Sequence, residues 1–173
     1  MIEGHRTSII GLDRTYYAGS MQAEPATAGE GVDRRGARAR WHLRLGLWSL
    51  ALFVTMGVAL EALHGLKWGS YVDVEASTRR HMWTLAHAHG SLLGLLHVAL
   101  GLAIERRLLA AGRALTGASW LLLGASVALP AGFFLGGLWF HAGDPGLGIL
   151  LVPPGGIALA AAMVLAALAC ERG

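Results

Sequence analysis

Four histidines lie within one strongly apolar stretch of the chain, residues 80–101: His81, His87, His89 and His97. Imidazole nitrogens can ligate a transition metal or haem iron, and they exchange protons near neutral pH. A polar side chain is costly inside a helix of membrane length, so each histidine there needs a partner or a function. The stretch therefore predicts a polar site within a membrane helix.

Helical geometry divides these histidines into separate groups. At about 100° per residue, His87 and His97 share an arc of about 80° with Gly90 and Gly94. Glycines on such an arc let another backbone or a flat cofactor come close, so Gly90 and Gly94 are candidate cofactor-binding positions. His89 lies about 200° from His87 on a regular helix. The two side chains therefore cannot chelate one ion unless the helix is distorted.

Other polar side chains are predicted at the depth of His87. Glu61 and His64 are three residues apart near the outer end of the first apolar segment, and hence on one helix face. His141 and Asp144 follow the outer end of the third apolar segment. The outer third of the bundle is therefore expected to hold a cluster whose candidate metal ligands are Glu61, His64, His87, His89 and His141.

His97 is predicted to stand alone in the inner half of the bundle. The equivalent level of the first helix is near residues 47–50, which offer no histidine, and His42 is expected at the helix boundary. Two stacked haems with paired axial histidines are therefore disfavoured, and the site is expected in the outer half.

The outer cluster suits three kinds of site. A single Cu, Zn or Fe ion is one, with ligands drawn from Glu61, His64, His87 and His141. Haem b is another, with His87 as one axial ligand and His64 or His141 as the other. The third is a buried hydrogen-bond network without a cofactor. A di-iron centre is disfavoured because the chain has no second Glu-x-x-His pair.

The composition predicts the fold that positions these residues. Hydrophobic residues make up 54% of the chain and charged residues 14%, with 25 glycines, as expected of packed transmembrane helices. Four stretches are almost free of charge and long enough to span a bilayer. We therefore expect an all-α, polytopic four-helix bundle with helices at about 43–64, 81–104, 114–140 and 147–170. These helices form a transmembrane domain over residues 41–173, after a flexible, basic-ended tail over residues 1–40.

The distribution of Lys and Arg predicts the orientation of the helices. One side of the predicted membrane holds Arg34, Arg35, Arg38, Arg40, Arg44, Arg106, Arg107, Arg113 and Arg172, whereas the other holds Lys67, Arg79 and Arg80. The richer side is expected in the cytoplasm, and with it both termini. This charge suits the anionic lipids of the inner leaflet. The predicted partner is therefore the lipid bilayer, not nucleic acid, and other membrane subunits or further copies of the chain are left open.

Several motifs carry a resemblance to known proteins. They are Arg80-x-Met82-Trp83-x-Leu-Ala-His87-Ala-His89-Gly90, Gly132-Phe-Phe-Leu-Gly-Gly137, Asp144-Pro-Gly-Leu-Gly148 and Val152-Pro-Pro-Gly155. Over residues 45–170 the chain resembles small four-helix bacterial integral membrane proteins that carry a Met-Trp-x-Leu-Ala-His-Ala-His-Gly segment. This resemblance implies a multi-pass protein of the bacterial cytoplasmic membrane.

The segment around His87 is also distantly similar to the second helix of haem-copper oxidase subunit I, which supplies a haem ligand just below the outer surface. That likeness implies His87 or His89 as a haem ligand. The chain departs from the family in having four predicted helices instead of twelve. It also lacks the clustered copper-ligand histidines and the His-Pro-Glu-Val-Tyr motif. It therefore cannot reduce oxygen on its own.

The sequence thus predicts a small integral membrane protein that binds haem b or a metal ion for electron transfer, sensing or cofactor handling. It is not expected to be an enzyme on its own, because we find no nucleotide-binding loop, activated nucleophile or paired catalytic carboxylates. One alternative is an accessory subunit of a larger membrane complex, with a purely structural polar network. The other is a protein that conducts protons or a solute, with Glu61 and the histidines as a relay.

Overall fold

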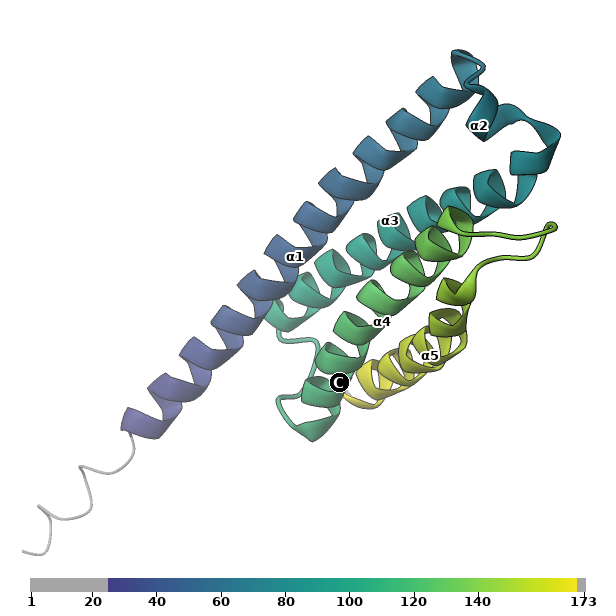
Figure 1. The fold of residues 1–173 in the computed structure, drawn as a ribbon. Helices are drawn as coiled ribbons and strands as arrows, with labels where there is room; N and C mark the ends of the chain where they lie inside the picture. The colour runs from purple at the N-terminus through teal and green to yellow at the C-terminus, as the bar shows by residue number, and fades with distance from the viewer. Residues whose placement is uncertain (1–24, 171–173) are drawn as a thin grey trace, which may run out of the picture. The chain divides into compact units, whose positions relative to one another are not determined.

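A computed structural model of the protein describes residues 25–170. Its elements are, in order, α1 (Pro25–Gly65), α2 (Gly69–Val72), the 3-10 helix η1 (Val74–Ala76), α3 (Ser77–Glu105), α4 (Arg113–Leu138), the 3-10 helix η2 (Leu147–Leu151) and α5 (Val152–Leu168) (Figure 1). The chain from Arg35 onward forms one compact unit, and every contact described below lies within it.

Four of the helical segments are long and apolar enough to cross a membrane: Arg34–Gly65, Val74–Glu105, Arg113–Leu138 and Leu147–Leu168. The prediction of an all-α protein with four apolar helices is therefore confirmed. The first helix begins earlier than expected, since α1 already starts at Pro25. Proline suits the first turn of a helix, and the alanines and arginines that follow are good helix formers. Residues 25–40 are thus helical instead of a flexible tail, whereas residues 1–24 lie outside the described part.

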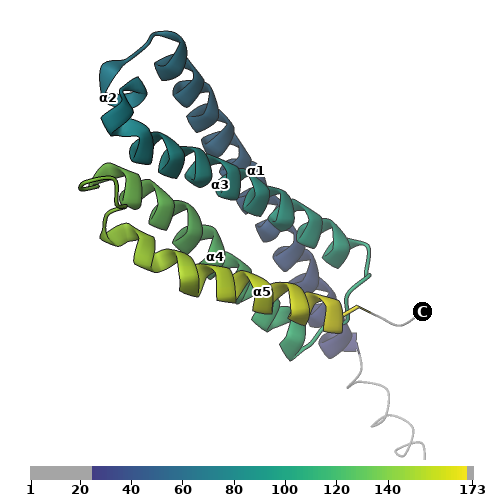
Figure 2. The same cartoon turned by 90° about the vertical axis from the view of Figure 1, so that its right-hand side faces the viewer.

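The helix α4 packs against both α3 and α5. Figures 1 and 2 show α4 between these two neighbours and α1 alongside α3. Small residues allow α1 to approach α3 closely. A side-chain carbon built on Gly46 would lie 2.6 Å from the carbonyl oxygen of Gly94, and one built on Gly101 would lie 3.0 Å from that of Ala39. Close backbone contact of this kind is how transmembrane helices gain van der Waals energy in lipid.

The outward faces of α1 and α5 are apolar and open. Only 6% of the most apolar window of the first span and 11% of that of the last are buried, against 39% and 44% for the two spans between them. Large side chains such as Trp48, Leu52, Ile157 and Val164 are exposed on these faces. In water such a surface would be unstable, so it implies contact with lipid and indicates a multi-pass membrane protein.

Polar contacts and prolines organise the helix ends. The Arg35 guanidinium donates hydrogen bonds to the carbonyls of Ile104, at 3.1 Å, and Leu109, which satisfies acceptors at the carboxyl end of α3. We call this end of the molecule, with Arg35, the end of α3 and the start of α4, the basic end.

At the opposite end, Pro153 and Pro154 occupy the first turn of α5. Proline is tolerated at this position because the first turn of a helix needs no backbone donor.

We expect Gly46→Ala to lower the thermal unfolding temperature in detergent, because the added methyl group would force α1 away from Gly94. Gly124→Ala is the matched control, since a side-chain carbon at that position meets nothing within 4 Å. Replacing glycine by alanine at an exposed helical position such as Gly124 stabilises a helix by up to about 1 kcal/mol, so the control should not lower the unfolding temperature. Equal unfolding temperatures for the two variants would contradict the close contact of α1 with α3.

Candidate functional site

The most deeply buried polar group in the described part of the chain is a pair of histidines, His42 on α1 and His97 on α3. Both side chains have no exposed surface. Their Nδ1 atoms lie 2.7 Å apart, which is a short hydrogen bond, and their rings are stacked with centroids 5.0 Å apart. The prediction that His97 stands alone is therefore wrong.

The helix register explains why the pair was missed. Gly94 lies against Gly46, so His97, one turn further along α3, meets the antiparallel α1 one turn earlier, where His42 stands. The level expected on α1, residues 47–50, is wrong by between one and two helical turns. Because α1 begins at Pro25, His42 also lies inside a helix and not at its boundary.

Two serines of α4 extend the pair into a chain of four side chains. The Nε2 atom of His42 lies 3.0 Å from Ser119 Oγ, and the Nε2 atom of His97 lies 2.9 Å from Ser126 Oγ. Every ring nitrogen of the pair therefore has a hydrogen-bond partner. The chain, which we call the histidine relay, runs Ser119–His42–His97–Ser126 and connects α1, α3 and α4.

The serine hydroxyls limit where the protons of the relay can be. Ser119 Oγ donates to the carbonyl of Leu115 at 2.9 Å, and Ser126 Oγ donates to that of Leu122 at 2.7 Å. A hydroxyl has one hydrogen to donate, so each serine accepts from the imidazole beside it. Both Nε2 atoms then carry hydrogen. The bond between the two Nδ1 atoms needs a further hydrogen, so the arrangement holds three protons and one positive charge.

A neutral pair fits the same positions after one small change. With two protons on the two rings, one lies between the Nδ1 atoms and only one Nε2 atom carries hydrogen. The serine beside the other Nε2 atom then turns its hydroxyl from its own helix to the imidazole. The two forms differ by one proton and one hydroxyl rotation. The geometry is therefore that of a site that can gain or lose a single proton.

A cavity reaches the Ser119 end of the relay. It has a volume of about 420 Å³. Its lining consists of Ala37, Arg38, Trp41, Thr116, Ser119 and Trp120. The Arg38 guanidinium donates to Thr116 Oγ1 at 3.1 Å, and the Trp41 ring meets that of His42 edge-on at 4.7 Å. We call it the arginine cavity. It places a cation and an aromatic wall directly beside the histidine pair.

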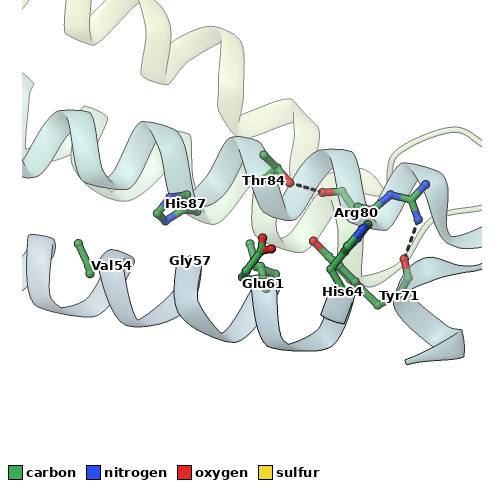
Figure 3. Close-up of a pocket in the computed structure, with 9 residues that line it drawn as sticks. Val54, Gly57, Glu61, His64, Tyr71, Arg80, Thr84 and His87 are labelled. Carbon is green, nitrogen blue, oxygen red and sulfur yellow. Dashed lines mark hydrogen bonds between the residues drawn. The ribbon is translucent and has the colours of Figure 1, made fainter. Parts of the chain in front are cut away.

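Three of the residues predicted as ligands line one pocket at the other end of the helices. Glu61 and His64 of α1 and His87 of α3 share a pocket of about 520 Å³, which we call the outer pocket (Figure 3). The rest of its lining is Val54, Gly57, Leu60, Tyr71, Arg80 and Thr84. Figure 3 shows Glu61 pointing from α1 towards α3. These three residues therefore line one pocket, on the side where α1 and α3 separate.

His87 is held in one orientation within the outer pocket. Its Nδ1 atom lies 2.6 Å from the carbonyl oxygen of Phe53, and its ring packs over Gly57. The carbonyl can only accept, so Nδ1 carries the hydrogen and a neutral ring keeps its lone pair on Nε2. Haem and metal ligands are commonly oriented by a backbone carbonyl in this way.

The other predicted site residues lie elsewhere. The Nδ1 atom of His89 donates to the carbonyl of Leu85 at 2.9 Å, and its ring lies 4.7 Å from that of Phe133 on α4. It faces away from His87, as the 200° separation required. His141 lies in the loop after α4, where its backbone pairs with Asp144. Neither histidine lines the outer pocket.

Gly90 and Gly94 contact α1 instead of a cavity. A side-chain carbon on Gly90 would collide with the Phe53 ring, and one on Gly94 would lie 3.0 Å from Leu50. The sequence was compatible with two neighbours for this glycine face, a helix backbone or a flat cofactor. In the structure α1 fills the space.

No group of three or more His, Cys, Asp or Glu side chains among residues 25–170 is placed to hold a metal ion. The described residues therefore do not form the predicted metal centre with three or more ligands. Comparisons of the chain with protein-family models, curated proteins and solved structures find no match. The resemblance to four-helix bacterial proteins and the binding of haem or a metal therefore stay predictions.

We expect His97→Leu to lower the free energy of unfolding by about 1–2 kcal/mol, because His42 is then buried with one ring nitrogen unpaired. The double variant His42→Leu with His97→Leu should cost less than the sum of the two single changes, since neither ring is left alone. Unfolding in mixed detergent measures this cycle, with the exposed His81→Leu as the control. A loss of unfolding free energy in the double variant that equals the sum of the losses in the two single variants would contradict the hydrogen bond between the rings.

Proposed function

We propose that this protein is a non-enzymatic integral membrane subunit that binds one proton at the histidine relay and passes it on. The observation that supports the proposal is the 2.7 Å contact of the Nδ1 atoms of His42 and His97, with a serine at each outer nitrogen. Of the functions predicted from the sequence, this one is closest to the proton-conducting alternative. It uses the inner histidines, however, and not Glu61.

Proton transfer along the relay needs only small movements. In the neutral form the hydrogen bonds all point one way, from Ser119 to Ser126 or the reverse. A proton that enters at one end lets a proton leave at the other, and the polarity of the chain reverses. Pro130 has no N–H group, so the carbonyl of Ser126, four residues earlier, loses its usual helical donor. The Ser126 end therefore has a spare acceptor for a proton or a water molecule.

The relay serves one end of the molecule only. His87 and His97 are ten residues apart on α3, or about 15 Å along the helix. Between them Gly90 and Gly94 are in direct contact with α1, which leaves no room for water. A proton that enters through the arginine cavity therefore reaches the middle of the bundle but not the outer pocket. This suits an accessory subunit that supplies protons to a partner, and the bias of basic residues supports entry from the cytoplasmic side.

We expect the pair to take up one proton, and not two, when the pH is lowered. A second proton would place two N–H groups head to head at 2.7 Å. The measurement is ¹⁵N spectroscopy of protein with labelled histidine in nanodiscs, where ring shifts distinguish neutral from cationic imidazole. Replacing His97 by asparagine should remove the shared-proton signals.

His81→Asn is the matched control, because His81 is exposed and has no part in the relay. Its shared-proton signals should match those of the unmodified protein. Two imidazoles that both stay neutral at every pH at which the protein remains folded would contradict the proposal and favour a purely structural network.

A second candidate function is haem or metal binding at the outer pocket. The observation that favours it is the orientation of His87, whose Nδ1 hydrogen is held by the Phe53 carbonyl. A haem with His87 as its only protein ligand, or a metal ion with further ligands from outside this chain, is compatible with the pocket. The charge of Glu61 would then offset part of the charge of the iron or metal ion.

We expect protein reconstituted with haem to show a Soret band that is lost in His87→Ala and kept in His89→Ala. Both variants remove one histidine from α3, but only His87 lines the pocket. Stoichiometric metal without a Soret band, lost on Glu61→Gln, would assign a metal ion instead. A colourless, metal-free protein that is stable after reconstitution would exclude both cofactors at this pocket.

A further inference from the structure

We infer that the arginine cavity binds the phosphate group of an anionic membrane lipid and thereby favours the protonated form of the histidine relay. The second part of this inference depends on the proposed function, whereas the first part does not. The lining offers one cation, Arg38, and no carboxylate. The hydroxyls of Thr116 and Ser119 each donate to a carbonyl of their own helix, so the donors left for a ligand are the remaining N–H groups of the Arg38 guanidinium. Such a set suits an anion with several acceptor oxygens.

The Arg38 side chain is held in place but is not saturated. It is half-buried, and its contact with Thr116 Oγ1 uses one of the five N–H donors of a guanidinium. None of the hydrogen bonds or ion pairs described for Arg38 involves a carboxylate, so no side chain that the structure describes offsets its charge. A positive charge beside a membrane-spanning segment is stabilised when an anion takes the remaining donors.

The walls of the cavity indicate a lipid as the source of the anion. Trp41 and Trp120 line it and are 41% and 67% exposed, so their indole rings face the surroundings of the helices and not the core. Tryptophan at such a position is typical of the interface between lipid tails and headgroups. The cavity also lies at the basic end, where Arg35 and Arg113 add to the attraction for anionic headgroups.

A phosphate in the cavity would act on the relay through two contacts. Arg38 precedes His42 by one helical turn, and Ser119 belongs to both the cavity and the relay. Offsetting the charge of Arg38 removes a repulsion that opposes a cationic histidine pair. Within the part of the chain that the structure describes, the titratable or charged side chains that face the pair are Arg38 on α1 and the two histidines themselves. The partners on α4 are serines, and α5 carries no titratable residue.

Native mass spectrometry of the detergent-solubilised chain tests the binding. With phosphatidylglycerol we expect one tightly held lipid per chain, and with phosphatidylcholine none. In Arg38→Gln the fraction of chains that retain this lipid should fall at least tenfold, although glutamine keeps an amide donor for Thr116. Arg38→Lys should retain most of the lipid. Arg44→Gln is the matched control, because it removes an exposed arginine from the same helix outside the cavity.

Equal retention of the two lipids, or equal loss in Arg38→Gln and Arg44→Gln, would overturn the inference. Displacement of the lipid by millimolar inorganic phosphate would reassign the cavity to a soluble anion. The effect on the relay is read separately from ¹⁵N spectra recorded as the pH is lowered. The cationic pair should be more populated in phosphatidylglycerol than in phosphatidylcholine nanodiscs, and this difference should vanish in Arg38→Gln. A bound lipid without that difference would overturn the coupling and leave the relay itself intact.

Discussion

The hydrogen bond between His42 and His97 is the contact on which the arrangement of the helices depends. In a bilayer, lipid tails are as apolar as the helix surfaces, so burial alone does not hold α1 against its neighbours. Apart from the polar contacts, α1 meets α3 through small residues such as Gly46 and Gly94. The relay adds directional bonds from α1 to both α3 and α4. Together with the glycine contacts, it fixes the rotation and the register of α1.

This single contact also separates the molecule into two chemical regions. Around it α1 and α3 are close enough that glycine backbones touch, and the space between them is dry. Towards Gly65 the two helices separate and leave the outer pocket with Glu61, His64 and His87 (Figure 3). Towards Arg35 the relay opens at the arginine cavity. The two polar regions are therefore suited to different ligands, and neither is part of a path through the whole membrane.

The sequence was sufficient to predict four long apolar helices and to single out three of the residues that line the outer pocket, Glu61, His64 and His87. Charge-free stretches of membrane length give four helices directly, and the angle between His87 and His89 follows from helical periodicity alone. The histidine pair was not predictable in the same way. Its recognition required the register between α1 and α3, which depends on which glycines meet, and periodicity within one helix carries no such information. One signal was present in the sequence: His42 and His97 both lie three or four residues from a glycine that faces the partner helix, at positions 46 and 94.

The central claim is that the two imidazoles share one hydrogen across their Nδ1 atoms. The most direct measurement is the nitrogen–nitrogen coupling through that hydrogen bond, in nanodisc-embedded protein with ¹⁵N-labelled histidine. A coupling between the Nδ1 atoms of His42 and His97, present in the unmodified protein and absent from His97→Asn, is the result we predict. Two well-resolved imidazoles without a coupling, each with an independent tautomer, would contradict the relay and the function proposed for it.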